Sequence, residues 1–355
     1  GGKESLGGRG GTEFSAVVIA VAQPAYDPRR AARRRERSCK HGAPVTALTR
    51  RHAFAAGGGS LHGWTLHPAI FRVGVWKDGR LEKKMNISGL VRTGVFPDRA
   101  PNRQCWLLFR ASSLSRLRDF QQGKMYMNSV QYFSDLEGEV SQGLRGDLLE
   151  KKYLKLHSKI NEKKVGGIFI EINGKEIPLG DDASLYLDLP NPKNVFVFCM
   201  AAIADGPDGI IPGEKDGKVQ LSERFLEFGD HVLIVKNNAE FSRRLNSAIA
   251  SHPHLYGGEC FEGGYGQVEY VDMAVHNGVV GLFRKDRAYS WQREYRICFG
   301  AGAEALNENG ALELNIGDLT DITQIVSTQQ FISEPLILRR GVIKKVDGEM
   351  VHKYI

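Results

Sequence analysis

The stretch LLFRASSLSRLRDFQQGKMYMNSVQYFSDLEGEVSQGLRGDLLE, residues 107–150, contains the patterns of several secondary-structure elements in a short space. It begins with an apolar run that ends on Arg110, and a helix-like segment follows up to Gly123, a residue typical of helix ends. The next residues, from Met125 to Phe133, alternate between apolar and polar, as a β-strand does, so Tyr126, Tyr132 and Phe133 are expected on one strand. The stretch therefore predicts a strand, a helix and a second strand, closed by an acidic loop.

Strand patterns also dominate the rest of the chain. Residues 195–200, VFVFCM, form a continuous apolar run that predicts a buried strand. Asn173-Gly174 lies between two strand-like runs and is the strongest hairpin signal in the chain. Helical patterns are few, and no regular alternation of strand and helix occurs. The sequence predicts a strand-rich α+β fold with a mainly antiparallel sheet.

Residues 1–84 differ in composition from the remainder. They hold 16 Lys and Arg against 6 Asp and Glu, whereas the whole chain of 355 residues has a net charge of only +7. We therefore expect a basic, disordered leader over residues 1–84 and a single α+β domain over residues 85–355. The apolar run at residues 14–22 also resembles a signal peptide, and the arginine block at residues 29–37 a targeting or nucleic-acid-binding arm.

The residues after the leader carry a small net negative charge, so nucleic-acid binding is expected only through the leader. The five cysteines are scattered and odd in number, which predicts free thiols in a reducing, cytoplasmic compartment. No apolar run approaches the roughly 18 residues of a membrane span. Neither cysteines nor histidines have a metal-ligand spacing, so no metal site is expected.

Two segments carry candidate functional residues, and the first is the opening stretch. Arg110 ends a strand, where a guanidinium can bind a phosphate with two hydrogen bonds. Tyr126, Tyr132 and Phe133 offer faces for stacking on an aromatic ligand, and Asn128 or Ser129 can fix an amide group. The alternative is that the aromatic residues belong to the core and that Arg110 forms a surface ion pair.

The second segment is YSWQREYRICF, residues 289–299. On a strand, Glu294 and Arg296 point to one face while Arg293 and Tyr295 point to the other. A carboxylate beside an arginine stays ionised at neutral pH, which suits stabilisation of a developing positive charge. The alternative is a structural Glu–Arg pair between strands.

These segments carry a resemblance to a family of uncharacterised bacterial and phage proteins from mobile elements and defence loci. The resemblance rests on L-F-R, G-x-x-Y-M-N and Y-F-x-D-x-E, and later on Y-S-x-Q-x-E-Y-R-I and N-I-G-D-L. It covers roughly residues 106–338 and implies little about activity.

The chain also has a more distant similarity to the ADP-ribosyltransferase fold, which implies a split sheet that binds NAD. On this resemblance Arg110 would hold the NAD ribose or phosphate, and Glu294 would stabilise the oxocarbenium-like transition state. The nicotinamide would lie against Tyr126, Ser129, Tyr132 and Phe133. Gln292-Arg293-Glu294 matches the Q/E-x-E pattern of some members, although no S-T-S element is present.

The resulting hypothesis is an NAD-using ADP-ribosyltransferase or NAD glycohydrolase, with a small-molecule nucleotide as ligand and an unknown macromolecular acceptor. It requires Arg110, Tyr132 and Glu294 to face one cleft, and a Glu294 on the opposite face of the sheet from Arg110 would contradict it. One alternative is a non-catalytic binding or interaction protein of a mobile element. Another is a metal-dependent nuclease, which would use Asp135, Glu137, Asp147 and Glu150.

Overall fold

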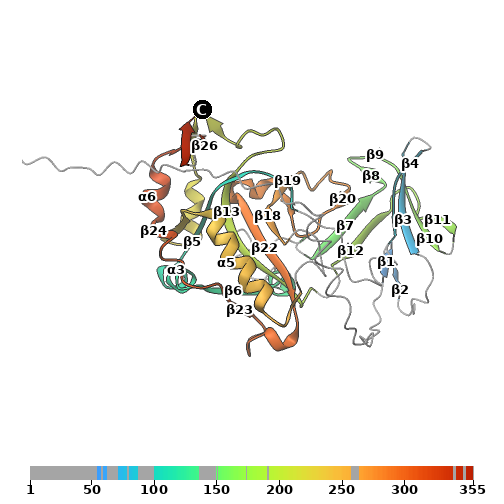
Figure 1. Cartoon of the computed structure of the whole chain (residues 1–355). Helices are drawn as coiled ribbons and strands as arrows, with labels where there is room; N and C mark the ends of the chain where they lie inside the picture. The colour runs from blue at the N-terminus through green and yellow to red at the C-terminus, as the bar shows by residue number, and fades with distance from the viewer. Residues whose placement is uncertain are drawn as a thin grey trace, which may run out of the picture.

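The computed structural model describes most of the chain after residue 100 and short segments before it (Figure 1). The described residues are 54–56, 59–61, 71–77, 80–86, 100–135, 149, 151–172, 174–189, 192–256, 264–338, 341–346 and 349–354. The predicted fold class is confirmed, because the described elements are mostly strands in antiparallel sheets, with few helices.

A nine-stranded antiparallel sheet forms the main body (Figure 1). Its central path runs in the order β17-β22-β13-β5-β16-β24, and β18, β6 and β23 pair at its sides. In chain order its strands are β5 (Cys105–Ser112), β6 (Lys124–Ser129), β13 (Val195–Ala204), β16 (His231–Val235), β17 (Leu255–Tyr256), β18 (Tyr265–Gln267), β22 (Glu294–Ala301), β23 (Leu312–Asn315) and β24 (Thr323–Ser327).

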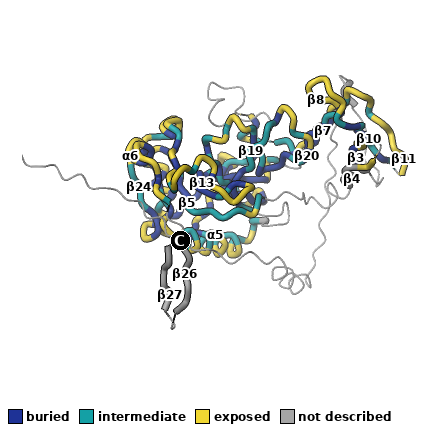
Figure 2. The backbone as a smooth tube through the Cα atoms, turned by 90° about the horizontal axis from the view of Figure 1, so that it is seen from above, coloured by how far each residue is buried: buried dark blue, intermediate teal, exposed yellow. Residues whose placement is uncertain are grey.

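Both faces of this sheet are covered, which explains why the sequence of β13 is apolar throughout. On one face lie the helices α3 (Leu114–Gln121) and α5 (Asn238–Ser251), and Phe120 of α3 lies 4.8 Å from Phe198 of β13, centroid to centroid. On the other face lie the 3-10 helix η2 (Glu223–Glu227) and helix α6 (Thr328–Ser333). There Phe109 of β5 contacts Phe225 and Phe331, at 5.3 and 5.1 Å between ring centroids. Buried residues are accordingly concentrated along β13 and β5 (Figure 2).

The sheet is split because β13 exchanges one neighbour for another along a single edge. Its C-terminal half pairs with β5, up to the pair Ala201–Phe109. Its N-terminal half pairs with β6 on the same edge, at Phe196 and Val197. In the described register, residues 198–200 have no partner on this edge, and β5 and β6 diverge there.

A second group of strands extends from the main body (Figure 1). Strands β3 (Phe71–Lys77), β4 (Arg80–Asn86), β10 (Gly167–Ile172) and β11 (Lys175–Pro178) form a sheet in the order β11-β10-β3-β4. The β10–β11 hairpin occurs where Asn173-Gly174 predicts one, and Gly174 has the positive φ that such a turn requires. Strands β7 (Lys152–His157), β12 (Ser184–Asp188) and β20 (Gly278–Val279) form a sheet between this group and the main body.

The leader boundary expected at residue 84 falls inside β4. Strand β3 pairs with β10, some 95 residues further along the chain, through Phe71 to Trp76. Its side chains Val73 and Val75 are buried in the same hydrophobic cluster as the core of the main sheet. Residues 71–77 and 80–84 therefore belong to the folded part, whereas the arginine block and the signal-like run lie outside the described residues.

The remaining described elements are short. They are β1 (Phe54–Ala56), β2 (Gly59–Leu61), α4 (Val130–Asp135), β8 (Lys159–Ile160), β9 (Lys163–Lys164), β14 (Glu214–Lys215), β15 (Lys218–Val219), β19 (Glu269–Val271), β21 (Arg284–Asp286), η3 (Arg287–Gln292), η4 (Ala303–Ala305), β25 (Leu336–Ile337), β26 (Gly341–Val346) and β27 (Glu349–Tyr354). Within the described segments, the helices are all too short or too polar to cross a membrane.

The substitution Phe109→Ala tests the packing on the η2 face. Because Phe109 is fully buried against two other phenylalanine rings, we expect the free energy of unfolding to fall by about 3–5 kcal/mol. Urea denaturation followed by circular dichroism measures the change. Ile210→Ala is the control, since Ile210 is 56% exposed and its loss should change stability by less than about 0.5 kcal/mol. Equal effects of the two substitutions would contradict this packing.

Candidate functional site

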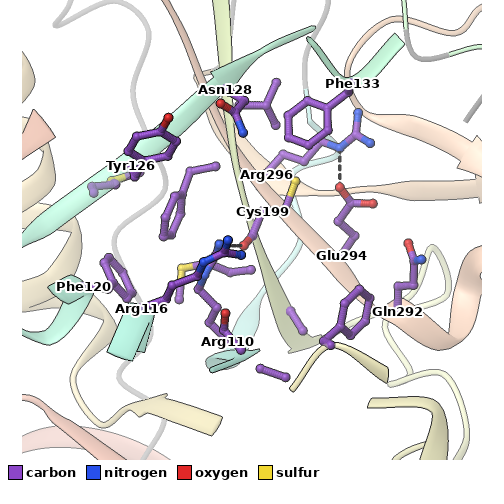
Figure 3. Close-up of a pocket in the computed structure, with 18 of the residues that line it drawn as sticks. Arg110, Arg116, Phe120, Tyr126, Asn128, Phe133, Cys199, Gln292, Glu294 and Arg296 are labelled. Carbon is purple, nitrogen blue, oxygen red and sulfur yellow. Dashed lines mark hydrogen bonds and ion pairs between the residues drawn. The ribbon is translucent and has the colours of Figure 1, made fainter. Parts of the chain in front are cut away.

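A cavity of about 770 Å³ lies at the split between β5 and β6 (Figure 3). Its walls come from both sides of the sheet: from β5, α3 and β6, from the middle of β13, and from η2, η3 and β22. Of the predicted site residues, those that line it are Arg110, Tyr126, Tyr132, Phe133, Gln292 and Glu294, together with Asn128. Ser129 does not line it. Arg110 and Glu294, which are 184 positions apart in the chain, thus line one cavity.

Glu294 is the first residue of β22 and forms a buried charge cluster with Arg296 and Lys285. Its Oε1 accepts a hydrogen bond from Nε of Arg296 at 2.7 Å, and its Oε2 lies 3.1 Å from Nζ of Lys285. Arg296 also donates to the carbonyl of Leu282 at 2.8 Å, and Lys285 donates to Oε1 of Gln292 at 3.0 Å. All the charged side chains of the cluster are less than a tenth exposed.

The electrostatics of this cluster keep Glu294 ionised. Burial alone would raise the pKa of Glu294, but the charges of Arg296 and Lys285 and the hydrogen bond from Arg296 outweigh it. The pKa of Glu294 therefore lies well below that of an ordinary glutamate. One carboxylate and two cations leave the cluster with a net charge of +1, which favours an anionic ligand nearby.

Arg110 occupies the split itself. Its guanidinium donates a hydrogen bond to the carbonyl of Cys199 in the stretch where β13 has no strand partner on that edge. It also lies over the ring of Phe198, 4.1 Å from the centroid. Part of its hydrogen-bonding capacity is thus used within the protein.

Arg110 and Glu294 leave the sheet on opposite faces. Glu294 pairs with Ala201, and Ala201 pairs with Phe109, so these three side chains share the η2 face. Arg110 is the next residue after Phe109 and points to the α3 face, where Phe198 also lies. The expectation that Arg110 and Glu294 share a face is therefore wrong. Both line one cavity only because the cavity passes through the split.

The aromatic residues are held differently from the prediction, which placed them all on one strand. Tyr126 lies on β6 and is 47% exposed, while its neighbours Met125 and Met127 are fully buried on the other side. Strand β6 ends at Ser129, and Tyr132 and Phe133 belong to helix α4, with their rings 5.6 Å apart.

Ser129 acts as the cap of α4. Its Oγ accepts a hydrogen bond from the backbone N–H of Tyr132 at 3.1 Å, which is the usual role of serine before a helix. The side chain predicted to contact a ligand is therefore used to turn the chain from β6 into α4.

Three cations at the cavity were not predicted as site residues. Arg116 of α3 and Lys124 of β6 are exposed at its wall, and Lys285 is buried beside Glu294. The periodicity of α3 places Arg116 on its polar side without indicating a site. Lys285 precedes Glu294 by nine residues, a distance that suggests contact only once the turn of η3 is known.

The proposed nuclease residues are only partly within the described structure. Asp135 is the last residue of α4, whereas Glu137, Asp147 and Glu150 lie outside the described residues. In the parts of the chain that the structure describes, no group of three His, Cys, Asp or Glu side chains is placed to bind a metal ion.

No protein-family model matches this chain, and comparison with curated proteins and with solved structures gives no significant match.

Removing Arg296 tests the charge cluster. In Arg296→Met, Glu294 loses its shortest ion pair and stays buried, so we expect the free energy of unfolding to fall by about 3–5 kcal/mol. Chemical denaturation at pH 7 measures it. Arg243→Met is the matched control, because Arg243 also binds a glutamate at 2.7 Å but its side chain is 67% exposed. A control that loses as much stability as Arg296→Met would contradict the importance of burial.

The pH dependence of stability tests the ionisation of Glu294. Since its pKa is lower in the folded state than in the unfolded state, the stabilisation is complete above the unfolded value, about 4.3, and is lost as pH falls towards the folded value. Glu294→Gln should therefore destabilise the protein equally at pH 7 and pH 6, and progressively less below about pH 4. Denaturation curves across this range measure the difference. A difference that grows on acidification would mean that the folded protein holds Glu294 protonated.

Proposed function

We propose that the cavity binds a small-molecule nucleotide and that the protein cleaves NAD there, as a glycohydrolase or ADP-ribosyltransferase. Because Arg110 and Glu294 lie on opposite faces of the sheet, the arrangement expected from the sequence, with both on one face, is given up, and the proposal depends instead on a ligand that passes through the split and reaches both. The observation that carries the proposal is that one cavity brings together exposed tyrosine rings, several cations and a buried, ionised carboxylate. A nucleotide offers the complementary groups: aromatic rings, phosphates and a ribose.

The cations supply the contacts for the phosphates. Arg116 and Lys124 are exposed on the α3 side, and Arg110 lies at the split with part of its hydrogen bonding already used. On the η2 side, Lys285 and Arg296 give the Glu294 cluster its positive charge. Because the cavity joins the two sides, an elongated ligand such as NAD can place its phosphates near the first group and a ribose near Glu294.

Glu294 provides the charge that the reaction requires. When the bond between C1′ of the ribose and the nicotinamide nitrogen breaks, its electron pair leaves with nicotinamide and positive charge develops on the ribose. A water or an acceptor then adds to C1′ and loses a proton. Arg296 and Lys285 hold the Glu294 carboxylate in place. Because the cluster as a whole is positive, Glu294 stabilises this cation only if its oxygens lie closer to C1′ than the two cationic groups do.

The second candidate function is binding of the same ligand without catalysis. Two observations favour it. Both oxygens of Glu294 already have cationic partners, which offset its negative charge, and Arg110 points away from Glu294 across the sheet. An ion pair that serves only to hold β22 and η3 together would show the same contacts.

Two measurements on the full chain separate these functions: calorimetric binding of ADP-ribose and release of nicotinamide from NAD. We expect ADP-ribose to bind and NAD to be cleaved, with cleavage at least about 100-fold slower in Glu294→Gln, because the charge facing the ribose is lost. Tyr126→Ala should weaken ADP-ribose binding, because a ring that can stack on the ligand is removed. The variant should still fold, because the side chain of Tyr126 is exposed and contributes little to the core.

Glu304→Gln is the control for charge, because Glu304 is exposed on η4, away from the cavity. Circular dichroism verifies that each variant is folded. Binding of ADP-ribose without nicotinamide release would select the non-catalytic function. The absence of both binding and release would exclude the catalytic and the non-catalytic function alike.

A further inference from the structure

Tyr126 of β6 offers an exposed aromatic ring to the cavity at the split. Its side chain lines the cavity and is 47% exposed, and no described residue forms a ring contact or a side-chain hydrogen bond with it. Tyr132, by contrast, already has Phe133 as a ring partner, at 5.6 Å between the centroids. An exposed ring of this kind is suited to stacking on a planar ligand such as a nucleobase.

A fixed carboxylate lies beside this ring. Glu313 of β23 is exposed, lines the same cavity and is the direct partner of Tyr126 in the antiparallel pair of β6 and β23, so their Cβ atoms are about 5 Å apart. Nδ2 of Asn307 donates to Oε1 of Glu313 at 2.7 Å. Asn307 is itself held, because its Oδ1 accepts the backbone N–H groups of Asn309 and Ala311, each at 3.0 Å.

This arrangement leaves one oxygen of the carboxylate open to a ligand. Among the described residues, Asn307 alone bonds to the Glu313 side chain, and it uses Oε1. Oε2 is therefore an acceptor at the edge of any flat ring that stacks on Tyr126.

A cation follows on the same side of β6. Lys124 precedes Tyr126 by two residues, which places the two side chains on one side of the strand about 7 Å apart. Its ion pair with Asp119 is exposed and 3.6 Å long, so Lys124 can bind a phosphate at little cost. A ribose spans the distance from the base at Tyr126 to that phosphate. The same cation disfavours a positively charged ligand beside the ring.

The position of Tyr126 determines which end of NAD it can bind. In the proposed reaction, the ribose that loses nicotinamide lies near the buried Glu294. Figure 3 shows Tyr126 and Glu294 on opposite sides of the cavity. The two phosphates separate that ribose from the adenosine end of NAD, so adenine is the ring that reaches Tyr126.

We propose that Tyr126, Glu313 and Lys124 form a subsite that selects adenine through its 6-amino group. The adenine ring stacks on Tyr126, its amino group donates to Oε2 of Glu313, and Lys124 binds the neighbouring phosphate. Guanine has a carbonyl oxygen in place of the amino group, and the carboxylate repels it. The subsite rests on the nucleotide binding of the proposed function and does not require cleavage of NAD.

Calorimetry on the full chain with two matched nucleotides tests the proposal. AMP and purine riboside 5′-monophosphate share the ring system, the ribose and the phosphate, and differ only in the amino group. We expect AMP to bind at least about tenfold more tightly, because its amino group bonds to a charged acceptor. In Glu313→Met this ratio should fall to about one. Any effect of the lost charge on the phosphate acts on both nucleotides and cancels in the ratio.

Glu308→Met is the matched control, because Glu308 is an exposed glutamate in the loop before β23 and does not line the cavity. This variant should keep the preference for AMP. Circular dichroism verifies that both variants are folded, which the exposure of both glutamates favours.

Several outcomes would overturn the subsite while the proposed function stands, provided that ADP-ribose binds. They are equal binding of the two matched nucleotides, GMP binding as tightly as AMP, a ratio unchanged in Glu313→Met, and no binding of AMP at all. Agmatine binding that is lost in Glu313→Met would also overturn it, by identifying a cationic side chain as the occupant. If neither AMP nor ADP-ribose binds, the subsite and the proposed function fail together.

Discussion

The exchange of partners along one edge of β13 is the constraint on which the rest of the site depends. In its C-terminal half β13 pairs with β5, in its N-terminal half with β6, and between them the sheet opens. A continuous sheet buried on both faces would leave no room for a ligand. The opening connects the two faces, and Arg110 satisfies the carbonyl of Cys199 that the missing strand leaves there. The cavity is thus a consequence of how the strands pair, and its lining follows from which residues fall at the split.

The charge cluster around Glu294 lies beside this opening and carries a desolvation cost. Three ionised groups are withdrawn from water, and a buried ion pair seldom repays that cost in stability. Each group is instead satisfied by specific hydrogen bonds, to Leu282 from Arg296 and to Gln292 from Lys285. Residues from β21, η3 and β22 are thereby held in one geometry at the cavity wall. The cluster has a fixed, ionised carboxylate and a net positive charge, which favours an anionic ligand such as a phosphate. Hydrophobic side chains in place of the cluster would supply neither the carboxylate nor the positive charge.

The sequence was sufficient for the fold class, and most of the predicted site residues line one cavity. It did not predict Arg116, Lys124 and Lys285 there, nor how the side chains are oriented. Period-two alternation and continuous apolar runs are local signals, and they predicted β5, β6, β13 and the β10–β11 hairpin. The relative orientation of Arg110 and Glu294 depends on the register of β5 and β22 against β13, and a shift of one residue reverses the face. No local pattern encodes that register. Residues 71–84 were assigned to the leader for a similar reason, because their partner β10 lies far along the chain. Ser129 shows the converse error, since a helix cap and a ligand contact require the same residue type.

The segment from η3 to β22 contributes side chains to the walls of two cavities, the one at the split and a second of about 600 Å³. A strand buried on both faces normally alternates between two parts of the core, but here the alternation directs side chains into two separate cavities. Tyr270 lines the second cavity and its hydroxyl accepts the backbone N–H of Glu294 at 2.8 Å, so the carboxylate of the first cavity is anchored through the wall of the second. Burial raises the pKa of this tyrosine, which keeps it a neutral phenol at any physiological pH. The hydrogen bond between Tyr270 and the backbone of Glu294 is therefore a direct contact between the walls of the two cavities.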